Sequence, residues 1–312
     1  MYMNHTGIFT EVIKLERKMT RRQHYVPQFY LRNFTDDENM FWIYNRSKKN
    51  INKSKPKDIC REDYLYETEW KNANEKLGKY VIPNGIENAF SIQEAEYSNV
   101  LKQIFKVCDM PCNQNALICS SQEKNILSRF VANILLRNPW SLKQYLQEDC
   151  LDDMQDNEDL ESIKEVLELL GFGGFESLCE AANRKVILDE KFDGGLPESL
   201  INEVGNMNFS FLGTKGTKFI TSDFPVLYET FDTDEGITKF LWIYLPISSE
   251  YALIYNRYKA SRNYRNRLFI LDNEKVKKMN RLYLKQDKEQ SNFIIAEIRS
   301  ELEMFTGVCE QH

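Results

Sequence analysis

The sequence predicts an α+β fold with a mostly helical middle and a small antiparallel sheet. We expect this sheet to be built from the C-terminal third of the chain and an N-terminal strand pair. Apolar residues recur every three or four positions through the middle, as on one face of a helix. Near residue 41 and after residue 207, short β-branched and aromatic runs alternate with turn residues, as in strands.

A single domain over residues 19–312 is expected, because no long polar linker interrupts the pattern. Residues 1–18 are interpreted as a peripheral extension. Met19 directly follows them, so translation starting at Met1 or at Met19 remains open.

The run from Gln23 to Phe34 holds the one histidine that lies away from the chain termini. Pro27 pushes the residue before it into extended geometry and can itself occupy the first turn of a helix. We therefore expect an extended segment around His24 and a short helix over residues 27–33. His24 is a candidate catalytic residue, because an imidazole exchanges its proton near neutral pH, and the alternative is a structural histidine.

The elements that follow are predicted in order from apolar periodicity, helix caps and turn residues. Ser120 or Ser121 can cap the second long helix, and Pro139 ends it. The acidic block at residues 148–161 is interpreted as a linker or exposed turn. The predicted elements are strands at 40–44 and 59–66; helices at 85–107, 120–137, from 140 into the acidic block, 159–170, 175–184 and 197–207; strands at 209–212, 218–221, 226–229, 239–246 and 251–255; and helices at 273–286 and 289–304.

Composition indicates a cytoplasmic protein that does not cross a membrane. No stretch of about 18 apolar residues exists, and the N-terminus lacks a signal-peptide layout. The cysteines number seven, an odd count that favours free thiols in a reducing compartment. Cys108, Cys112 and Cys119 are spaced closely enough to consider zinc, but they include no regular pair and no neighbouring histidine.

Glu94 and Arg137 are charged residues on apolar helix faces. Glu94 lies four residues after Phe90 and three before Tyr97, and Glu87 shares its face one heptad earlier. A buried charge must be paired, bound to a metal or neutralised. Two interpretations follow: a structural Glu94–Arg137 ion pair that joins two antiparallel helices, or a pair of catalytic residues.

Asp223 follows a predicted strand and precedes Pro225, so we expect it on a turn at a strand end. A carboxylate there can hold a divalent cation or act as a base. The alternative is a turn in which Asp223 or Ser222 accepts hydrogen bonds from nearby backbone N–H groups.

Together, His24, Glu94, Arg137 and Asp223 form the predicted catalytic set. In this hypothesis Glu94 and Asp223 bind Mg²⁺ or Mn²⁺, while Arg137 holds an anionic group. A basic segment interleaved with tyrosines is the predicted nucleic-acid contact, since phosphates pair with cations and bases stack on aromatic rings. Its cations are Arg257, Lys259, Arg262, Arg265 and Arg267. A second basic stretch lies between Lys48 and Lys57, and the alternative for both is a solvated charged surface.

The order of several motifs resembles a bacterial family, domain-of-unknown-function family 4238, from about residue 22 to 296. These motifs are His24-Tyr25-Val26-Pro27 with the residues up to Phe34, Ile86-Glu87 through Glu94, Arg137-Asn138-Pro139, Phe219 to Val226, Leu245 to Ser248, and Val276 to Asn280. Phe224 departs from the family's pattern, in which Asn is expected. The resemblance implies a bacterial or phage-type cytosolic protein and brings no activity with it.

Two functions remain open at this point. The first is a metal-dependent nuclease or related phosphoryl-transfer enzyme that acts on nucleic acid, with a role in phage defence. The second is a non-catalytic binding or regulatory protein whose buried polar residues are structural. The oligomeric state is left open.

Overall fold

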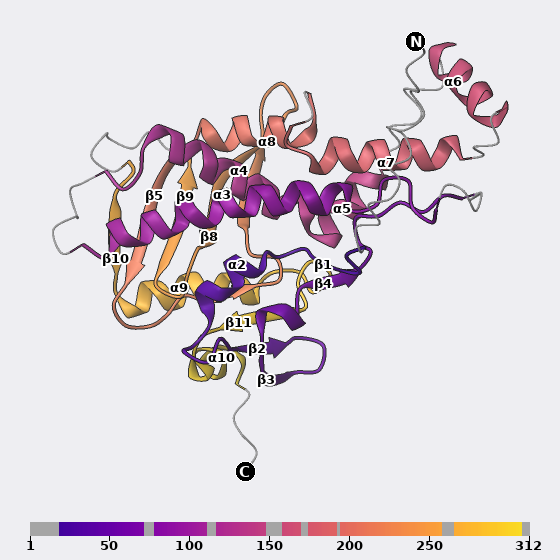
Figure 1. The fold of residues 1–312 in the computed structure, drawn as a ribbon. Coiled ribbons are helices and arrows are strands. Elements are labelled where there is room, and N and C mark those ends of the chain that lie inside the picture. Colours follow the sequence, from indigo (N-terminus) through magenta and orange to yellow (C-terminus); the bar gives the residue numbers. More distant parts are fainter. Residues whose placement is uncertain are drawn as a thin grey trace, which may run out of the picture.

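The computed structural model describes residues 19–71, 78–110, 117–147, 158–169, 174–191, 194–257 and 265–307. The predicted extension at residues 1–18 and the acidic linker at residues 148–157 lie outside these ranges. The described residues confirm an α+β fold, with a helical layer on one side and two sheets beside it (Figure 1). None of its helices within the described ranges is long and apolar enough to cross a membrane.

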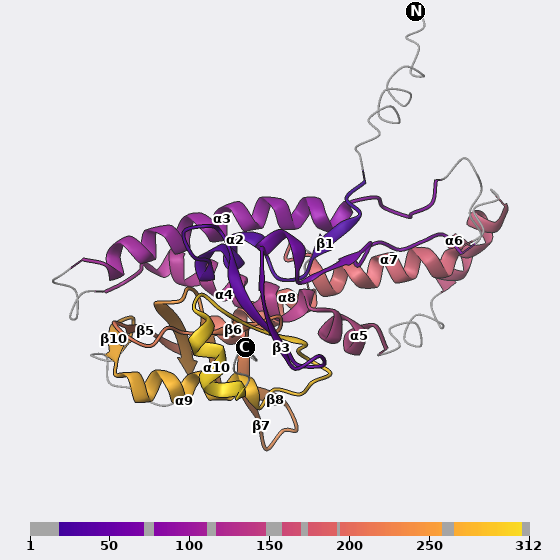
Figure 2. The same cartoon turned by 90° about the horizontal axis from the view of Figure 1, so that it is seen from below.

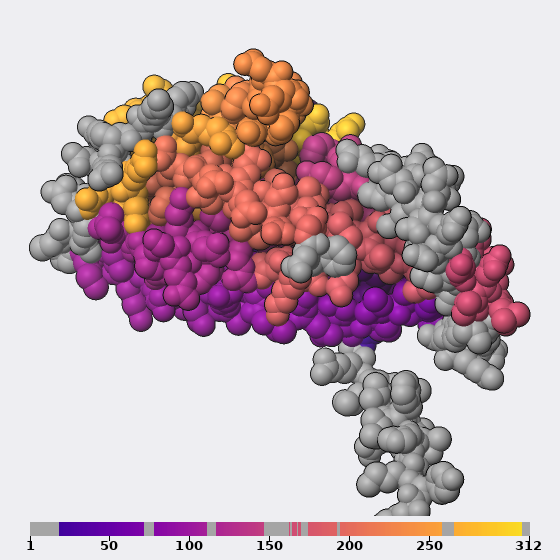
Figure 3. All heavy atoms as spheres, turned by 90° about the horizontal axis from the view of Figure 1, so that it is seen from above, coloured from indigo at the N-terminus to yellow at the C-terminus, as the bar shows by residue number. Residues whose placement is uncertain are grey.

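The helical layer confirms the predicted helical middle. Its members are α3 (Gly85–Cys108), α4 (Ser121–Arg137), α5 (Pro139–Gln147), α6 (Glu158–Leu169), α7 (Phe175–Leu188) and α8 (Leu196–Gly205). Ser120 caps α4, because its hydroxyl accepts the Glu123 N–H at 3.2 Å while the Glu123 carboxylate accepts the Ser120 N–H at 2.7 Å. Seen from the helical side, α3 and α4 form one continuous face next to α8 (Figure 3).

A five-stranded sheet packs under this layer and is mixed, so it differs from the antiparallel sheet we expected. Its order is β10 (Leu268–Leu271), β5 (Asn208–Thr214), β9 (Tyr251–Asn256), β8 (Thr238–Pro246) and β7 (Leu227–Asp232). β10, a four-residue strand that the sequence analysis missed, runs parallel to β5. Ile243 and Leu245 join the core shared with α4, while Tyr244 between them packs toward α9 (Asn273–Leu284).

A separate four-stranded antiparallel sheet joins the N-terminal strand pair to strands from the C-terminal third. Its order is β3 (Asn50–Ser54), β2 (Phe41–Asn45), β11 (Phe293–Ala296) and β6 (Thr221–Ser222). The predicted helix over residues 289–304 is wrong in its first half. Ile294 and Ile295 are fully buried in β11, and only α10 (Arg299–Thr306) is helical, because a short apolar run satisfies both periodicities.

Short elements connect the sheets to the helical layer (Figure 2). They are β1 (Arg22–His24), α2 (Gln28–Leu31), the 3₁₀ turns η1 (Arg32–Phe34) and η2 (Pro56–Asp58), and β4 (Arg61–Asp63). Tyr30 anchors α2, since its hydroxyl lies 2.7 Å from Thr221 Oγ1 and donates to the Pro246 carbonyl at 2.8 Å. This anchor fixes the position of the chain that leads back to His24.

Candidate functional site

His24 ends β1 and lies opposite Arg61 in the antiparallel β1–β4 pair. Side chains of directly opposed residues leave the same face of such a pair, so the imidazole and the guanidinium are neighbours. Nδ1 of His24 lies 3.5 Å from the Gln28 amide nitrogen, and Nε2 is buried with no hydrogen-bond partner among the described residues. Burial lowers the pKa of His24 to about 4, with the nearby Lys57 backbone opposing the shift. The imidazole is therefore neutral at physiological pH.

Three arginines surround this imidazole. The charges of Arg137, Arg61 and Arg32 each lower the pKa of His24 further. Arg32 is exposed, whereas Arg61 is half-buried and Arg137 is 1% exposed. The Nε atoms of Arg61 and Arg137 are buried and have no partner among the described residues. We call His24 and these three arginines the His24 cluster.

Arg137 ends α4 and reaches several groups at once. Its Nη1 donates to Glu94 Oε1 at 2.8 Å and to Asn133 Oδ1 at 3.3 Å, while Nη2 donates to the His24 carbonyl. Its guanidinium also lies 4.2 Å from the Phe90 ring centre, at cation–π distance. The predicted ion pair between α3 and α4 is thus confirmed, and Arg137 ties it to the chain at His24.

Glu87 is a titratable residue that the sequence pattern marked only as a neighbour of Glu94 on the same helix face. Burial raises the pKa of Glu87 to about 7. The Arg137 charge opposes this shift in part, and the Glu94 charge adds to it. The spacing of one heptad between Glu87 and Glu94 was the signal in the sequence that could have identified this residue. A carboxyl group that titrates near neutral pH is a recognised mark of a functional site.

Asp223 is nearby but serves a different set of bonds. Its Oδ1 accepts from the Ser291 hydroxyl at 2.7 Å and from the Phe293 N–H at 3.1 Å, while the Asn292 N–H lies 3.1 Å from both oxygens. The side chain is 2% exposed, and burial raises its pKa. Asp223 thus fastens the start of β11 to the end of β6, and the local turn bond is made by Ser222, whose Oγ accepts the Phe224 N–H at 3.1 Å.

Two contacts connect Asp223 to the His24 cluster. The Asn138 amide donates to the Asp223 carbonyl at 2.9 Å, and the Tyr25 hydroxyl lies 3.5 Å from Oδ2. Asn138 and Tyr25 are the residues that follow Arg137 and His24. The structure therefore joins His24, Arg137 and Glu94 directly and brings Asp223 in through their neighbours.

A cation shared by Glu94 and Asp223 would have to compete with these bonds. Both carboxylate oxygens of Asp223 accept hydrogen bonds, and one carboxylate oxygen of Glu94 accepts from Arg137. No group of three metal-ligating side chains occurs among the described residues. An Mg²⁺ or Mn²⁺ ion held between the two carboxylates would have to replace these donors, and such a site stays a prediction.

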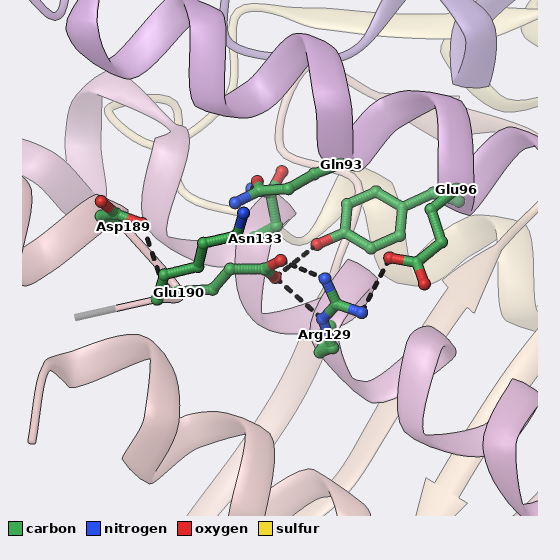
Figure 4. A network of polar contacts seen from close by, with 8 residues as sticks. Gln93, Glu96, Arg129, Asn133, Asp189 and Glu190 are labelled. Carbon is green, nitrogen blue, oxygen red and sulfur yellow. Dashed lines mark hydrogen bonds and ion pairs between the residues drawn. The ribbon is translucent and has the colours of Figure 1, made fainter. Parts of the chain in front are cut away.

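A second polar network continues along the α3–α4 seam (Figure 4). Arg129 binds both oxygens of Glu190, with Nε at 3.1 Å from Oε2, and it also donates to Glu96 at 2.8 Å. The Tyr97 hydroxyl donates to Glu190 at 2.8 Å. Glu190 is 6% exposed at its side chain and fully partnered, so this network is a structural clamp between α3, α4 and the chain after α7.

The described part of the predicted nucleic-acid segment is largely tied into the fold. Arg257 donates to Glu203 at 2.7 Å and to the Phe240 carbonyl at 2.6 Å, and Tyr255 is fully buried. Arg265 is exposed and Arg267 is half-buried. Lys259 and Arg262 lie outside the described residues.

The described cysteines carry free thiols. Cys60, Cys108, Cys119 and Cys179 are buried, and burial raises the pKa of Cys108 and of Cys119 to about 12. Cys112, the third residue of the spacing considered for zinc, lies outside the described residues. Thiols with so high a pKa are protonated and unreactive at neutral pH.

The comparisons with known proteins return one family. The family described as "Protein of unknown function (DUF4238)" matches residues 22–299. No curated protein and no solved structure matches the chain significantly. The match spans the His24 cluster, both sheets and the helical layer.

Proposed function

The chain belongs to the family Protein of unknown function (DUF4238), and from its own residues we propose a phosphoryl-transfer enzyme that cleaves nucleic acid at the His24 cluster. The resemblance found in the sequence is thereby confirmed. Because the family description names no activity, the proposal depends on side-chain chemistry alone.

One observation carries it: the His24 cluster contains three buried nitrogens that have no hydrogen-bond partner among the described residues. They are His24 Nε2, Arg61 Nε and Arg137 Nε. Buried polar atoms are satisfied in the great majority of cases, so an unmatched group points to a missing ligand or water. Guanidinium groups favour phosphate because their planar N–H donors match its oxygens. A phosphate group would accept hydrogen bonds from the two guanidinium nitrogens and balance the cluster's positive charge, which leaves the lone pair of His24 Nε2 for the attacking water.

Nucleic acid is the substrate class that suits the surroundings. Lys55 and Lys57 are exposed on and beside η2, and the backbone of Lys57 lies next to the imidazole. They continue the basic stretch that begins at Lys48, which is also exposed. Several exposed cations in this stretch favour a polymer with repeated phosphates over an isolated phosphate.

In the proposed reaction, a water oxygen forms a bond to phosphorus while the bond to the leaving oxygen breaks. Neutral His24 accepts the proton of the attacking water, and the arginines stabilise the charge that develops on the phosphate. The negative charge of a phosphodiester beside the imidazole raises its pKa, which makes it a stronger base than in the free protein. Glu87 holds a proton near neutral pH and is the candidate acid that protonates the leaving oxygen.

The test compares cleavage of labelled single- and double-stranded DNA and RNA by wild type, His24→Gln and Arg61→Gln. Each reaction is run with Mg²⁺, with Mn²⁺ and with EDTA, so that metal dependence is measured together with activity. We expect wild type to cleave at least one substrate and each variant to be slower by about 100-fold. Melting temperatures of all the proteins establish that the variants are folded.

Arg22→Gln is the matched control, because Arg22 is an exposed arginine two residues before His24 on the same strand. It should keep the wild-type rate. Full activity in His24→Gln would remove the cluster from the mechanism. Tight binding without cleavage by wild type under every condition would favour the second function, a non-catalytic nucleic-acid-binding or regulatory protein.

A role in phage defence and a cytoplasmic location belong to the same proposal. The proposed cleavage of nucleic acid motivates the role in phage defence, and the family resemblance motivates the location. Comparing phage plating on cells that carry wild type or His24→Gln would measure the first.

A further inference from the structure

A cavity of about 130 Å³ lies between the N-terminus of α3 and one side of α7. Gly85 and Ile86 line it from α3, and Ala181 lines it from α7. Tyr66 and Thr68, from the chain after β4, complete the wall. An engineered apolar cavity of similar volume in another protein accepts one benzene molecule, so this one can hold a single small ring or a short branched chain.

The first turn of α3 presents backbone N–H groups that no side chain caps. Asn84 occupies the N-cap position with left-handed geometry and makes no side-chain cap bond. Its own N–H donates to Glu67 at 3.2 Å, and its side-chain oxygen accepts the Thr20 N–H at 2.8 Å. The Gly85 N–H donates to the Ile82 carbonyl at 3.2 Å, and the dipole of this 24-residue helix attracts negative charge to its N-terminus.

An independent observation at the same cavity is the hydroxyl of Thr68. Thr68 is 5% exposed and lines the cavity, and its Oγ1 is buried with no hydrogen-bond partner among the described residues. A buried hydroxyl without a partner costs free energy, so its presence beside an empty volume indicates a ligand atom that completes it.

The surroundings of the cavity carry charges of both signs. Arg184, Lys185 and Asp189 line it, and the Glu67 carboxylate accepts the Asn84 N–H at the start of α3. Arg184 is held in place by the Leu65 carbonyl at 3.0 Å and by Glu180 at 3.1 Å. Lys185 is half exposed and lies 4.0 Å from Asp189, which is a loose contact that leaves its donors available.

We propose that this cavity binds a small organic anion, with its carboxylate or phosphate at the α3 N-terminus and Thr68 and its apolar body against Ile86 and Ala181. This site is distinct from the His24 cluster and does not depend on the proposed cleavage activity. The two share one support, since Tyr66 lines the cavity and donates its hydroxyl to the Arg137 carbonyl at 2.9 Å.

Benzoate, phenyl phosphate and neutral benzamide test the proposal in melting experiments on the full chain. Benzoate or phenyl phosphate should raise the melting temperature of wild type by about 4 °C at 100-fold above its dissociation constant, whereas benzamide should not. The stronger of the two anions identifies carboxylate or phosphate as the preferred group. No shift with either anion would overturn the proposal.

Two variants locate the binding site. Ala181→Leu fills the cavity and should abolish the shift, while Ala182→Leu, on the exposed side of the same helix, should keep it. Thr68→Val removes only the hydroxyl and should weaken anion binding at least fivefold without lowering the melting temperature of the free protein. An unchanged shift in Ala181→Leu would place binding elsewhere and contradict the proposal.

Discussion

His24 is kept neutral by its surroundings. Burial is the largest cause of its low pKa, and the positive charges of Arg137, Arg61 and Arg32 act in the same direction. An imidazole among arginines is unusual for a structural histidine. The positive charges disfavour its protonated form, so it cannot act as the cation of an ion pair. A negatively charged group that enters the cluster would balance these positive charges.

Titration of His24 by NMR tests this at the level of one side chain. The His24 resonance, identified by its loss in His24→Gln, should titrate near pH 4 in the free protein. Inorganic phosphate should raise that pKa by at least about one unit, since an anion stabilises the imidazolium. A midpoint near the ordinary value of about 6.5, unchanged by phosphate, would contradict the cluster's electrostatics.

Glu87→Gln should change the pH dependence of stability. The pKa of Glu87 rises from its ordinary 4.5 to about 7 on folding, so the folded state binds more protons than the unfolded state between these values. Stability is therefore fully present below about pH 4.5 and falls as pH rises through 7. At pH 8 we expect the variant to be more stable than wild type by roughly 2 kcal/mol, and at pH 4.5 about equal.

Urea unfolding at both pH values measures this difference. Glu235→Gln, in the exposed turn between β7 and β8, is the matched control and should show wild-type behaviour at both. If Glu87→Gln gained the same stability at pH 4.5 as at pH 8, ionisation of Glu87 would not be the cause.

At the level of elements, the α3–α4 interface carries its polar residues in two adjoining networks. Asn133 lies between the two networks. Its amide donates to Gln93 at 3.0 Å, and its oxygen accepts from Arg137. The Arg129–Glu190 clamp lies about one turn before Asn133 and about two turns before Arg137 along α4. Polar bonds of this kind fix the register of two helices, whereas apolar contacts alone would allow them to slide.

Removing the buried partner of the Glu94–Arg137 pair should cost more than removing the exposed one. Arg137→Met is expected to lower the free energy of unfolding by about 3 kcal/mol, because Glu94 and the His24 carbonyl lose their donor. Glu94→Gln should cost about 1 kcal/mol, since its side chain is 27% exposed and can turn to water.

A double-mutant cycle with urea unfolding gives the coupling between the two residues. Lys71→Met is the control, because the Lys71–Glu176 pair is exposed on both sides and should leave the unfolding midpoint unchanged. Equal, small effects of Arg137→Met and Lys71→Met would mean that the buried pair does not stabilise α3 against α4.

In the whole molecule, the His24 cluster lies where the helical layer meets the short N-terminal elements. Tyr30 packs on Phe130 of α4 and bonds to both sheets, so one side chain joins all three layers. Asp223 likewise ties β6 to β11 at the edge of the smaller sheet. The cluster is thus held by contacts that depend on the complete fold.

Amide hydrogen exchange should follow this arrangement. We expect the slowest exchange in β5, β9 and β8, whose strands lie inside the larger sheet under α4, and faster exchange in the edge strands β3 and β7. Mass spectrometry of proteolytic peptides resolves these segments. Exchange in β9 as fast as in β3 would contradict a core centred on the larger sheet.

The sequence by itself determined the fold class, the helices of the middle, most of the strands and the placement of Glu94 and Arg137 on apolar helix faces. These features are local or periodic: caps such as Ser120, turn residues and a heptad spacing specify them without reference to distant chain. The helix predicted at residues 289–304 was wrong for the same reason, since four apolar residues in a row do not distinguish a strand from a buried helix.

Only the tertiary structure decided which polar residues meet. Arg61 and Arg32 join His24 because β1 pairs with β4 and α2 folds back, and neither residue has a distinguishing spacing in the sequence. For Asp223 the sequence offered a metal or catalytic role or a local turn bond, yet its carboxylate accepts from the Ser291 hydroxyl and from the N–H groups of Asn292 and Phe293. Such contacts join residues far apart along the chain, and because no local pattern encodes them, only the folded chain reveals them.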